Sequence, residues 1–308
     1  MTDDLLNRVR EEFEIHYAPW ADLATCQRLG RRIQGVWTNG TIGIKAAAIE
    51  ALPELRIIVA QGAGTENIDM AAARRRGITV TNGSGTNPSC VADHAMALLL
   101  TLVRGIPSAD RLVRSGEWAS LRTDRPTIYG KRLGIVGLGK IGSMIARRAS
   151  GFDLSVAYHS RRPVEGAPYG FVADIVELAA HSDFLVLSCP GGPATYHMVN
   201  GAVLEALGPC GYIVNVARGS VIDTQALVDA LQREAIAGAA LDVFENEPGV
   251  PQVLWSLSNV VLTPHLAGAA PQVRREQIEL ALRNLKAFFA GGPLMNVLLR
   301  PDRPGAAG

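Results

Sequence analysis

Three short segments in the C-terminal half of the sequence carry polar side chains that together could assist a hydride donor in reducing a carbonyl group. They are Asn215–Gly219 with Arg218, Leu241–Pro248 with Asp242 and Glu247, and Thr263–Gly268 with His265. A hydride that reaches a carbonyl carbon needs a proton donor for the oxygen, and histidine suits this role because its pKa lies near neutral pH. A carboxylate beside the histidine favours its protonated form. An arginine binds a substrate carboxylate and polarises the carbonyl.

Each of these residues also has an ordinary interpretation when it is considered alone. Arg218 could be a solvated arginine, Glu247 a surface carboxylate and His265 a loop histidine. The catalytic interpretation depends on the three segments meeting at one place, and therefore on the elements that position them.

A glycine-rich turn earlier in the chain is typical of a dinucleotide site. An apolar strand is predicted over Leu133–Val136 and a helix over Lys140–Ser150, with a GxGxxG pattern at their junction. The first glycine permits a tight turn, the second lets the backbone approach a pyrophosphate, and the third lets helix and strand pack closely. The N-terminus of the helix would attract the anion. The predicted phosphate loop comprises Gly137, Leu138, Gly139, Lys140, Ile141 and Gly142. The alternative is a purely structural turn.

The end of the next predicted strand indicates which dinucleotide binds. NAD sites place an acidic residue about 20 residues beyond the loop, where it accepts from the ribose 2′-hydroxyl. No acidic residue lies between Leu154 and Pro163 here, and Ser160, Arg161 and Arg162 follow the strand instead. Because arginine pairs well with phosphate and serine adds a hydroxyl donor, we predict that NADPH is preferred over NADH. The alternative is a solvated arginine pair in an arginine-rich chain.

Predicted strands and helices alternate along nearly the whole sequence, in two series. The first series has predicted strands at Phe13–Tyr17, Gly35–Thr38, Arg56–Ala60 and Ile78–Thr81. The second has them at Leu133–Val136, Ser155–Tyr158, Phe184–Ser188, Tyr212–Val216, Ala237–Asp242 and Asn259–Leu262. Such alternation is typical of parallel sheets covered by helices. We therefore predict an α/β fold with two doubly wound parallel-sheet domains. The polar segments would converge at the carboxyl ends of the second series.

The domain boundary is predicted inside a helix rather than at a flexible linker. A helix is expected over Pro88–Val103, with a break at Gly105, and a surface excursion over Ser115–Arg132. The helix at Pro271–Ala290 follows the last strand and is expected to return to the first domain. The prediction is a discontinuous substrate domain (1–97 and 268–308) and a dinucleotide-binding domain (98–267).

Length and composition exclude several classes of protein. The 308 residues are 48% hydrophobic and 19% charged, which suits two folded domains rather than a disordered chain. A net charge of +1 argues against a nucleic-acid partner. The four cysteines are widely spaced and predict neither a disulfide framework nor a metal site. The N-terminus is not typical of a signal peptide, and the apolar run at Ala95–Val103 is too short to cross a bilayer. We expect a cytoplasmic protein without a membrane partner.

Taken together, these motifs resemble those of the D-isomer-specific 2-hydroxyacid dehydrogenase family. The matching segments are GIVGLGKIG, NVARGSVID, ALDVFENEP and TPHLAG, with LPELRIIVAQGAGTENIDM and RGITVTN in the first domain. The resemblance extends from about Ile33 to Val297. It implies a Rossmann cofactor domain and a flavodoxin-like substrate domain with an interdomain cleft. It also implies a homodimer, for which Ser115–Arg132 is the candidate arm.

The resemblance further implies roles for individual residues. Arg218 binds the substrate's carboxylate and carbonyl oxygen, His265 is the proton donor in reduction, and Glu247 is the partner of His265. The backbone N–H groups of Ala63 and Gly64 hold the substrate carboxylate. Beyond the phosphate loop and the second-strand residues, the implied cofactor contacts are Pro190, Val216, Ala217, Asp242, His265 and Gly268. The SCPGGPAT stretch departs from the commoner form of the family, so the adenine contacts of Pro190 are less well defined.

The expected activity is reduction of a small 2-oxoacid, of the glyoxylate or hydroxypyruvate type, to a D-2-hydroxyacid with NADPH. Hydroxyphenylpyruvate is the second expected substrate class. Ser160, Arg161 and the stretch VADHAMALLL look most like the NADPH-using reductases of these two groups. The alternative from another class is a nucleotide-sensing corepressor on the same fold, whose members keep the same Arg, Glu and His. The short PDRPGAAG end, without long disordered flanks, favours the enzyme.

Overall fold

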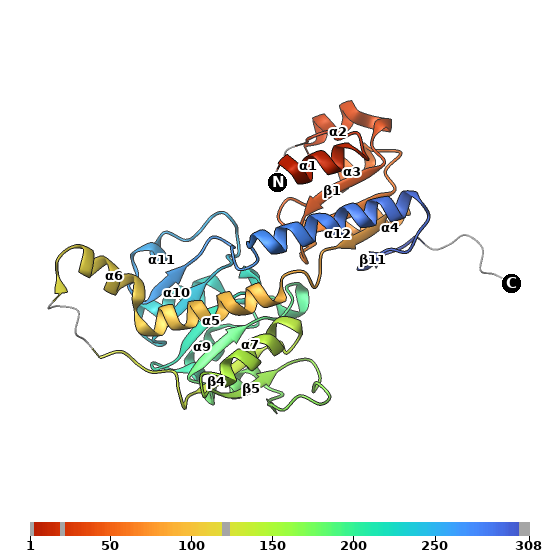
Figure 1. The fold of residues 1–308 in the computed structure, drawn as a ribbon. Coiled ribbons are helices and arrows are strands. Elements are labelled where there is room, and N and C mark those ends of the chain that lie inside the picture. Colours follow the sequence, from red (N-terminus) through yellow and green to blue (C-terminus); the bar gives the residue numbers. More distant parts are fainter. Residues whose placement is uncertain (1–2, 19–21, 119–123, 302–308) are drawn as a thin grey trace. The chain divides into compact units, whose positions relative to one another are not determined.

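The computed structural model describes residues 3–18, 22–118 and 124–301 (Figure 1). The chain forms two compact units: unit 1 comprises Met1–Asn87 and Ala269–Gly308, and unit 2 comprises Pro88–Gly268. The predicted boundary at 97/98 would divide helix α5 (Pro88–Arg104), whereas the structure keeps the whole helix in unit 2. The physical reason is packing, since the buried face of α5 shares one hydrophobic core with helix α7 (Lys140–Ser150) and the sheet of unit 2.

The sheet of unit 2 has seven strands in the order β10-β9-β8-β7-β4-β5-β6, and all of its pairings are parallel. Its strands are β4 (Arg132–Val136), β5 (Ser155–His159), β6 (Gly170–Phe171), β7 (Phe184–Leu187), β8 (Tyr212–Asn215), β9 (Gly238–Leu241) and β10 (Val260–Leu262). The order reverses at β4, which makes the sheet doubly wound and confirms the predicted fold class. The crevice for a ligand in such sheets lies at this reversal, beyond the carboxyl ends of the strands.

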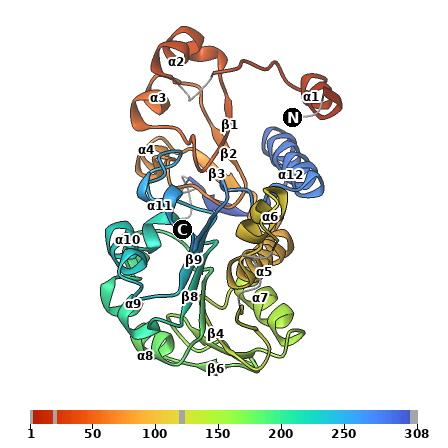
Figure 2. The ribbon, with the colours of Figure 1, turned by 90° about the vertical axis from the view of Figure 1, so that its left-hand side faces the viewer.

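Helices cover both faces of this sheet (Figure 2). Helices α5 and α7 lie on one face. The opposite face carries α8 (Ile175–Ala180), α9 (Gly201–Leu207) and α10 (Thr224–Gln232). Because both faces are covered, the central strands are apolar throughout, as in Phe184–Leu187 of β7. Complete burial of such a side chain contributes roughly 1.5–3 kcal/mol. The central strands therefore form a rigid base for the loops that follow them.

Unit 1 has a four-stranded sheet in the order β1-β2-β3-β11. Its strands are β1 (Gly35–Asn39), β2 (Ile57–Gln61), β3 (Thr79–Asn82) and β11 (Val297–Leu299). The first three are parallel, as predicted, and the unpredicted β11 is antiparallel to β3. One face packs against α2 (Leu23–Leu29), α3 (Ala46–Glu50) and α4 (Met70–Arg75), and the other against α12 (Pro271–Phe289). Helix α1 (Asp3–Arg10) contacts α12.

The predicted strand at Phe13–Tyr17 is wrong. These residues adopt no regular structure, although their alternating pattern is typical of a strand. Phe13 packs on the hydrophobic cluster formed by β2 and α12, and its ring lies 6.0 Å from that of Phe289. The phenylalanine is therefore buried by a helix instead of by pairing at the edge of the sheet.

Helix α5 ends at Gly105, whose φ of 61° breaks the helix as predicted, and α6 (Ile106–Arg114) follows. Residues 119–123 of the predicted excursion lie outside the described residues. Within the part of the chain that the structure describes, no single helix is both long and apolar enough to cross a membrane. Helices α5 and α6 meet that criterion only as a pair, and they are bent by 59°.

Candidate active site

Packing within the protein requires two of the glycines in the phosphate loop. Gly137 has a φ of 94°, and a Cβ there would lie 2.7 Å from the Cα of Cys189. A Cβ on Gly142 would lie only 2.0 Å from the carbonyl oxygen of Gly137. Any side chain at either position would push the turn after β4 away from the residues after β7. The close packing of the turn itself therefore requires glycine at these two positions.

Gly139 has a different environment, which fits a bound phosphate. A Cβ at this position would meet no protein atom within 4 Å, so nothing in the protein itself demands glycine there. Gly139 caps the N-terminus of α7 without a side-chain hydrogen bond, and the first turn of α7 contains no acidic residue. Leu138 points into the core, so only its backbone can face a ligand, whereas Lys140 is exposed. Free backbone N–H groups and a positive dipole end suit a pyrophosphate.

The turn after β5 carries the residues predicted to select NADPH. Arg161 and Arg162 are exposed, and among the described residues neither forms an ion pair with a carboxylate. The hydroxyl of Ser160 donates to the carbonyl oxygen of Arg162 at 2.5 Å. Because its proton is used within the turn, Ser160 does not offer the expected hydroxyl donor in this arrangement. The two guanidinium groups are left to interact with an anion.

His265 and Glu247 form a hydrogen-bonded pair. Nδ1 of His265 lies 2.8 Å from Oε2 of Glu247, whose other oxygen accepts from the backbone N–H of Phe244 at 3.1 Å. The hydrogen bond to Glu247 raises the pKa of His265, although burial opposes it. Burial by itself would raise the pKa of Glu247, but the hydrogen bonds from His265 and Phe244 bring it below its usual value. The pair therefore favours an imidazolium beside a carboxylate.

Arg218 lies beside this pair in the loop after β8. Asn215 holds the loop, since its side chain donates to the carbonyl oxygen of Arg218 at 3.0 Å and accepts from the N–H of Ala217 at 3.0 Å. Nη1 of Arg218 donates to the carbonyl oxygen of Ala217 at 2.7 Å. The positive charge of Arg218 contributes to lowering the pKa of both Glu247 and His265, so these three residues form one electrostatic site.

Asp242 is buried under the segment that carries His265. Its carboxylate accepts from the backbone N–H groups of Leu266 and Ala267 at 2.9 and 3.0 Å, and from Oγ1 of Thr263 at 2.6 Å. Nε2 of His94 approaches the same carboxylate at 3.3 Å. Burial alone would raise the pKa of Asp242, but these donors hold it below its usual value. Asp242 thus orders the backbone around His265, which sequence reasoning did not anticipate.

Four further predicted cofactor residues lie in the loops beyond β7, β8 and β10. Val216 and Ala217 are buried directly after β8, so mainly their backbone could meet a ligand. Pro190 is exposed after β7, and its carbonyl oxygen accepts from Thr195 at 2.7 Å. Gly268 is the last residue of unit 2. All four follow carboxyl ends of strands, the edge where doubly wound sheets bind ligands.

The predicted substrate residues Ala63 and Gly64 belong to unit 1, in the loop that follows β2. Gly62, with a φ of 84°, begins this loop. The carbonyl oxygen of Ala63 accepts from Nδ2 of Asn82 at 2.8 Å, and the N–H of Gly83 donates to Gly62 at 2.6 Å. Asn82 therefore orients the peptide between Ala63 and Gly64, a role that local sequence pattern did not indicate.

A doubly wound sheet with a glycine-rich turn at its reversal is the arrangement of dinucleotide-binding domains. Residues 96–267 match the family model described as D-isomer specific 2-hydroxyacid dehydrogenase, NAD binding domain. With more than half of its residues in this match, the chain belongs to that family.

Relatives and solved structures of this family match nearly the whole chain. The glyoxylate/hydroxypyruvate reductase HPR3 of Arabidopsis thaliana is 45% identical over 260 residues, which cover 84% of this chain and 80% of the relative. The hydroxyphenylpyruvate reductase of Plectranthus scutellarioides is 40% identical over 264 residues, which cover 85% of this chain and 84% of the relative. An NADPH-dependent glyoxylate/hydroxypyruvate reductase from Sinorhizobium meliloti, solved with NADP and malonate, superimposes with a TM-score of 0.91 at 38% identity. That match covers 99% of this chain and 97% of the solved one.

Proposed function

We propose that this protein is an NADPH-preferring reductase that converts small 2-oxoacids, of the glyoxylate or hydroxypyruvate type, to D-2-hydroxyacids. The observation that carries the proposal is the His265–Glu247 pair beside Arg218, at the strand ends of a sheet that also carries the phosphate loop. The Arabidopsis and Sinorhizobium relatives, both glyoxylate/hydroxypyruvate reductases, support these substrates, and the NADPH dependence of the Sinorhizobium enzyme supports the cofactor.

The proposed reaction adds one hydride and one proton to the substrate. The phosphate loop and the two arginines would hold NADPH, which would supply the hydride when bound. Because Nδ1 of His265 faces Glu247, its Nε2 is the atom that donates the proton to the carbonyl oxygen. Arg218 binds the carboxylate and polarises the carbonyl. Ala63 and Gly64 would add backbone N–H donors to the carboxylate. Asp242 is 1% exposed and already accepts from Leu266 and Ala267, so its part would be to hold the His265 segment rather than to contact the nicotinamide. In oxidation, His265 accepts the proton back.

A second candidate substrate is hydroxyphenylpyruvate, which the Plectranthus relative supports. The two substrate classes share the 2-oxoacid group, so the same catalytic residues serve both. An absorbance assay of cofactor oxidation with glyoxylate, hydroxypyruvate, hydroxyphenylpyruvate and pyruvate separates them. Nucleotide binding without turnover of any 2-oxoacid would contradict the enzyme and favour a corepressor.

Arg161 and Arg162, which follow β5, allow the proposed preference for NADPH over NADH to be tested. In the variant R161A/R162A, we expect kcat/KM with NADPH to fall by about 10- to 100-fold, because a hydrogen bond to a charged group contributes about 1.5–3 kcal/mol. The rate with NADH should not change, since NADH lacks the 2′-phosphate. The matched control is R74A/R75A, which removes an exposed arginine pair from α4 of unit 1. Equal losses with both cofactors would contradict the assignment.

We also propose a cytoplasmic homodimer. Cys90, Cys189 and Cys210 are free thiols, which suits a reducing compartment. Helix α6 has no buried residue, and Ile106 and Val113 on it are 50% and 48% exposed. Trp118 and Tyr129, near its end and beyond it, are also exposed. Apolar side chains gathered in this way are typical of an interface.

The dimer is tested by light scattering after size exclusion. The wild type should have twice the chain mass of 32.8 kDa, and I106E/V113E should have the mass of one chain, because charges at an apolar interface are costly to bury. A dimer that persists in this variant would place the interface elsewhere.

A further inference from the structure

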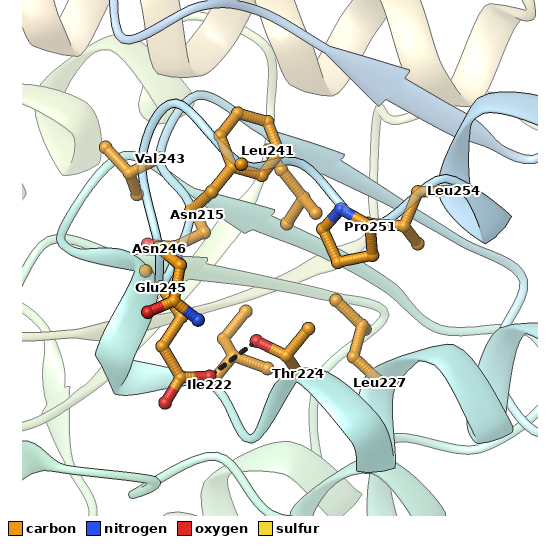
Figure 3. Close-up of a pocket in the computed structure, with 13 residues that line it drawn as sticks. Asn215, Ile222, Thr224, Leu227, Leu241, Val243, Glu245, Asn246, Pro251 and Leu254 are labelled. Atoms are coloured by element: carbon orange, nitrogen blue, oxygen red, sulfur yellow. Dashed lines mark hydrogen bonds between the residues drawn. The ribbon is translucent and has the colours of Figure 1, made fainter.

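Glu245 lies two residues before Glu247 and forms a second, separate set of hydrogen bonds. Its Oε1 accepts from Nε2 of His197 at 2.9 Å and from the hydroxyl of Tyr196 at 3.4 Å. Its Oε2 accepts from Oγ1 of Thr224 at 2.8 Å, as Figure 3 shows. The loop from Val243 to Gly249 is therefore held at two points, by Glu247 on His265 and by Glu245 on this cluster. We call Glu245, His197 and Thr224 the Glu245 anchor.

The partners of Glu245 belong to rigid parts of unit 2. Thr224 is the first residue of α10, where Asp223 forms the N-cap. The N–H of His197 donates to the carbonyl oxygen of Ser220 at 2.9 Å. A Cβ on Gly219 would lie 1.9 Å from the carbonyl carbon of Phe244, so the two backbones are in direct contact. The anchor thus connects the loop of Glu247 to the segment that follows Arg218.

Apolar packing beneath the loop is incomplete, which makes the polar contacts more important. A cavity of about 70 Å³ lies between the loop and the end of the sheet (Figure 3). Its walls include Leu227, Leu241 and Leu254, with Glu245 and Thr224 at one side. Side chains that border a void lose the dispersion contacts that a filled core supplies. The hydrogen bonds of Glu245 therefore add to the packing of Phe244 and Val250 in restraining this loop.

The backbone of His197 shows that its position is constrained. Its φ is 49°, a left-handed conformation that is strained for residues other than glycine, although histidine, like asparagine and aspartate, adopts it more often than most residues do. Its ring stacks on that of Tyr196, with 3.9 Å between the centroids, and Nδ1 lies 3.8 Å from Oδ2 of Asp223. Such strain persists only where the surrounding contacts enforce it. Here these contacts direct Nε2 at Glu245.

We propose that Glu245, held by His197 and Thr224, is a positioning residue that keeps Glu247 against His265. The inference rests on the proposed function, because it assigns the anchor a part in proton donation by His265. Without the anchor, Glu247 would move away from His265, whose proton would then be held less tightly. Arg218 and Asp242 are the other charged groups that act on His265.

The first test compares E245A with E245Q. In E245A we expect kcat to fall by about 10- to 100-fold, since small displacements of catalytic groups cost up to about 10² in rate. The upper pH limit of the reduction profile should move to lower pH, because a displaced Glu247 no longer raises the pKa of His265. E245Q should recover most of the activity, because an amide can accept from His197 and donate to Thr224. NADPH affinity should be unchanged in both.

The matched control is E205A, which removes an exposed glutamate of α9 that pairs with Arg233, in the same unit. Its pH profile should match that of the wild type. Loss of rate in E245A without any movement of the pH limit would mean a merely structural role and would overturn the proposal. So would equal losses in E245Q and E245A.

Two milder variants keep the test decisive if E245A does not fold. H197N retains a residue that tolerates the left-handed backbone but is too short to reach Glu245, and T224V removes only the hydroxyl. Both should move the pH limit in the same direction as E245A, by less. Unmoved limits in both would overturn the proposal.

An NMR titration of the His265 ring in the wild type and E245A, assigned with H265N, measures the same effect without turnover. A wild type that reduces no 2-oxoacid would refute the proposed function alone. An unchanged titration of His265 in folded E245A would refute the anchor alone.

Discussion

Replacement of His265 by asparagine should lower kcat for 2-oxoacid reduction by about 10²–10⁴-fold, the usual contribution of a general acid. Asparagine is the appropriate substitution because His265 has a φ of 51°, which asparagine tolerates better than alanine does. The shorter amide can still form hydrogen bonds in the loop, but its N–H protons are too weakly acidic to be transferred to the carbonyl oxygen. The loss should therefore appear in kcat, with NADPH affinity unchanged by fluorescence titration. A kcat near that of the wild type would refute the assigned role.

The pH dependence of the wild type and of E247Q tests the same assignment. Reduction requires protonated His265, so the rate should fall as the pH rises through the pKa of His265. The hydrogen bond to Glu247 raises that pKa and extends activity toward higher pH. E247Q removes the charge that favours the imidazolium, so the upper limit should move to lower pH. A limit at the same pH would show that another group donates the proton.

Replacement of Arg218 by methionine should lower kcat by about 10²–10³-fold, the usual cost of losing one donor to a developing oxyanion. KM for the 2-oxoacid should rise as well, because Arg218 also binds the carboxylate. Arg218 is half-buried and adjoins the His265–Glu247 pair. Because of this burial, a cation from the solvent should not compensate for the lost guanidinium. The substitution also removes a charge that opposes protonation of His265. The expected fall in kcat is therefore caused by weaker binding and polarisation of the substrate, and not by a weaker proton donor.

Substrate comparison isolates the carboxylate contact. Methylglyoxal has the carbonyl but no carboxylate, so R218M should impair its reduction less than that of glyoxylate. R218K should recover only part of the rate, because lysine keeps the charge but loses the bidentate geometry. Equal losses for both substrates would mean that Arg218 acts on the carbonyl alone.

Three of the predicted site residues could be recognised because they lie within three residues of a strand end. Arg218, Asp242 and His265 follow β8, β9 and β10, and an edge where parallel strands end brings such residues together. The hydrogen bonds that support them could not be predicted in this way. His94 reaches Thr263 from 169 positions away, and His197 reaches Glu245 from 48. Such partners depend on the packing of whole elements, which local pattern does not specify.

The elements that escaped prediction are short or atypical. Strand β6 has two residues, both exposed, and β11 has three, so neither has an apolar pattern long enough to identify it. Phe13–Tyr17 shows the opposite case. Its sequence alternates like a strand, but only Phe13 packs, on the cluster of β2 and α12, while Ile15 and Tyr17 are exposed. Ser160 also differs from its prediction, because its hydroxyl donates to the carbonyl oxygen of Arg162 in the same turn and not to a ligand.

The discontinuity of unit 1 has a consequence for biosynthesis. Unit 2 is a single uninterrupted stretch, and domains of that kind fold as units while the chain is made from its N-terminus. Unit 1 cannot complete its core then, because Ile57 and Val59 of β2 are covered by Ala281 and Leu285 of α12. One apolar face of the β1–β3 sheet therefore stays uncovered during synthesis until α12 has been made. In that interval the uncovered apolar surface makes the incomplete chain prone to aggregation.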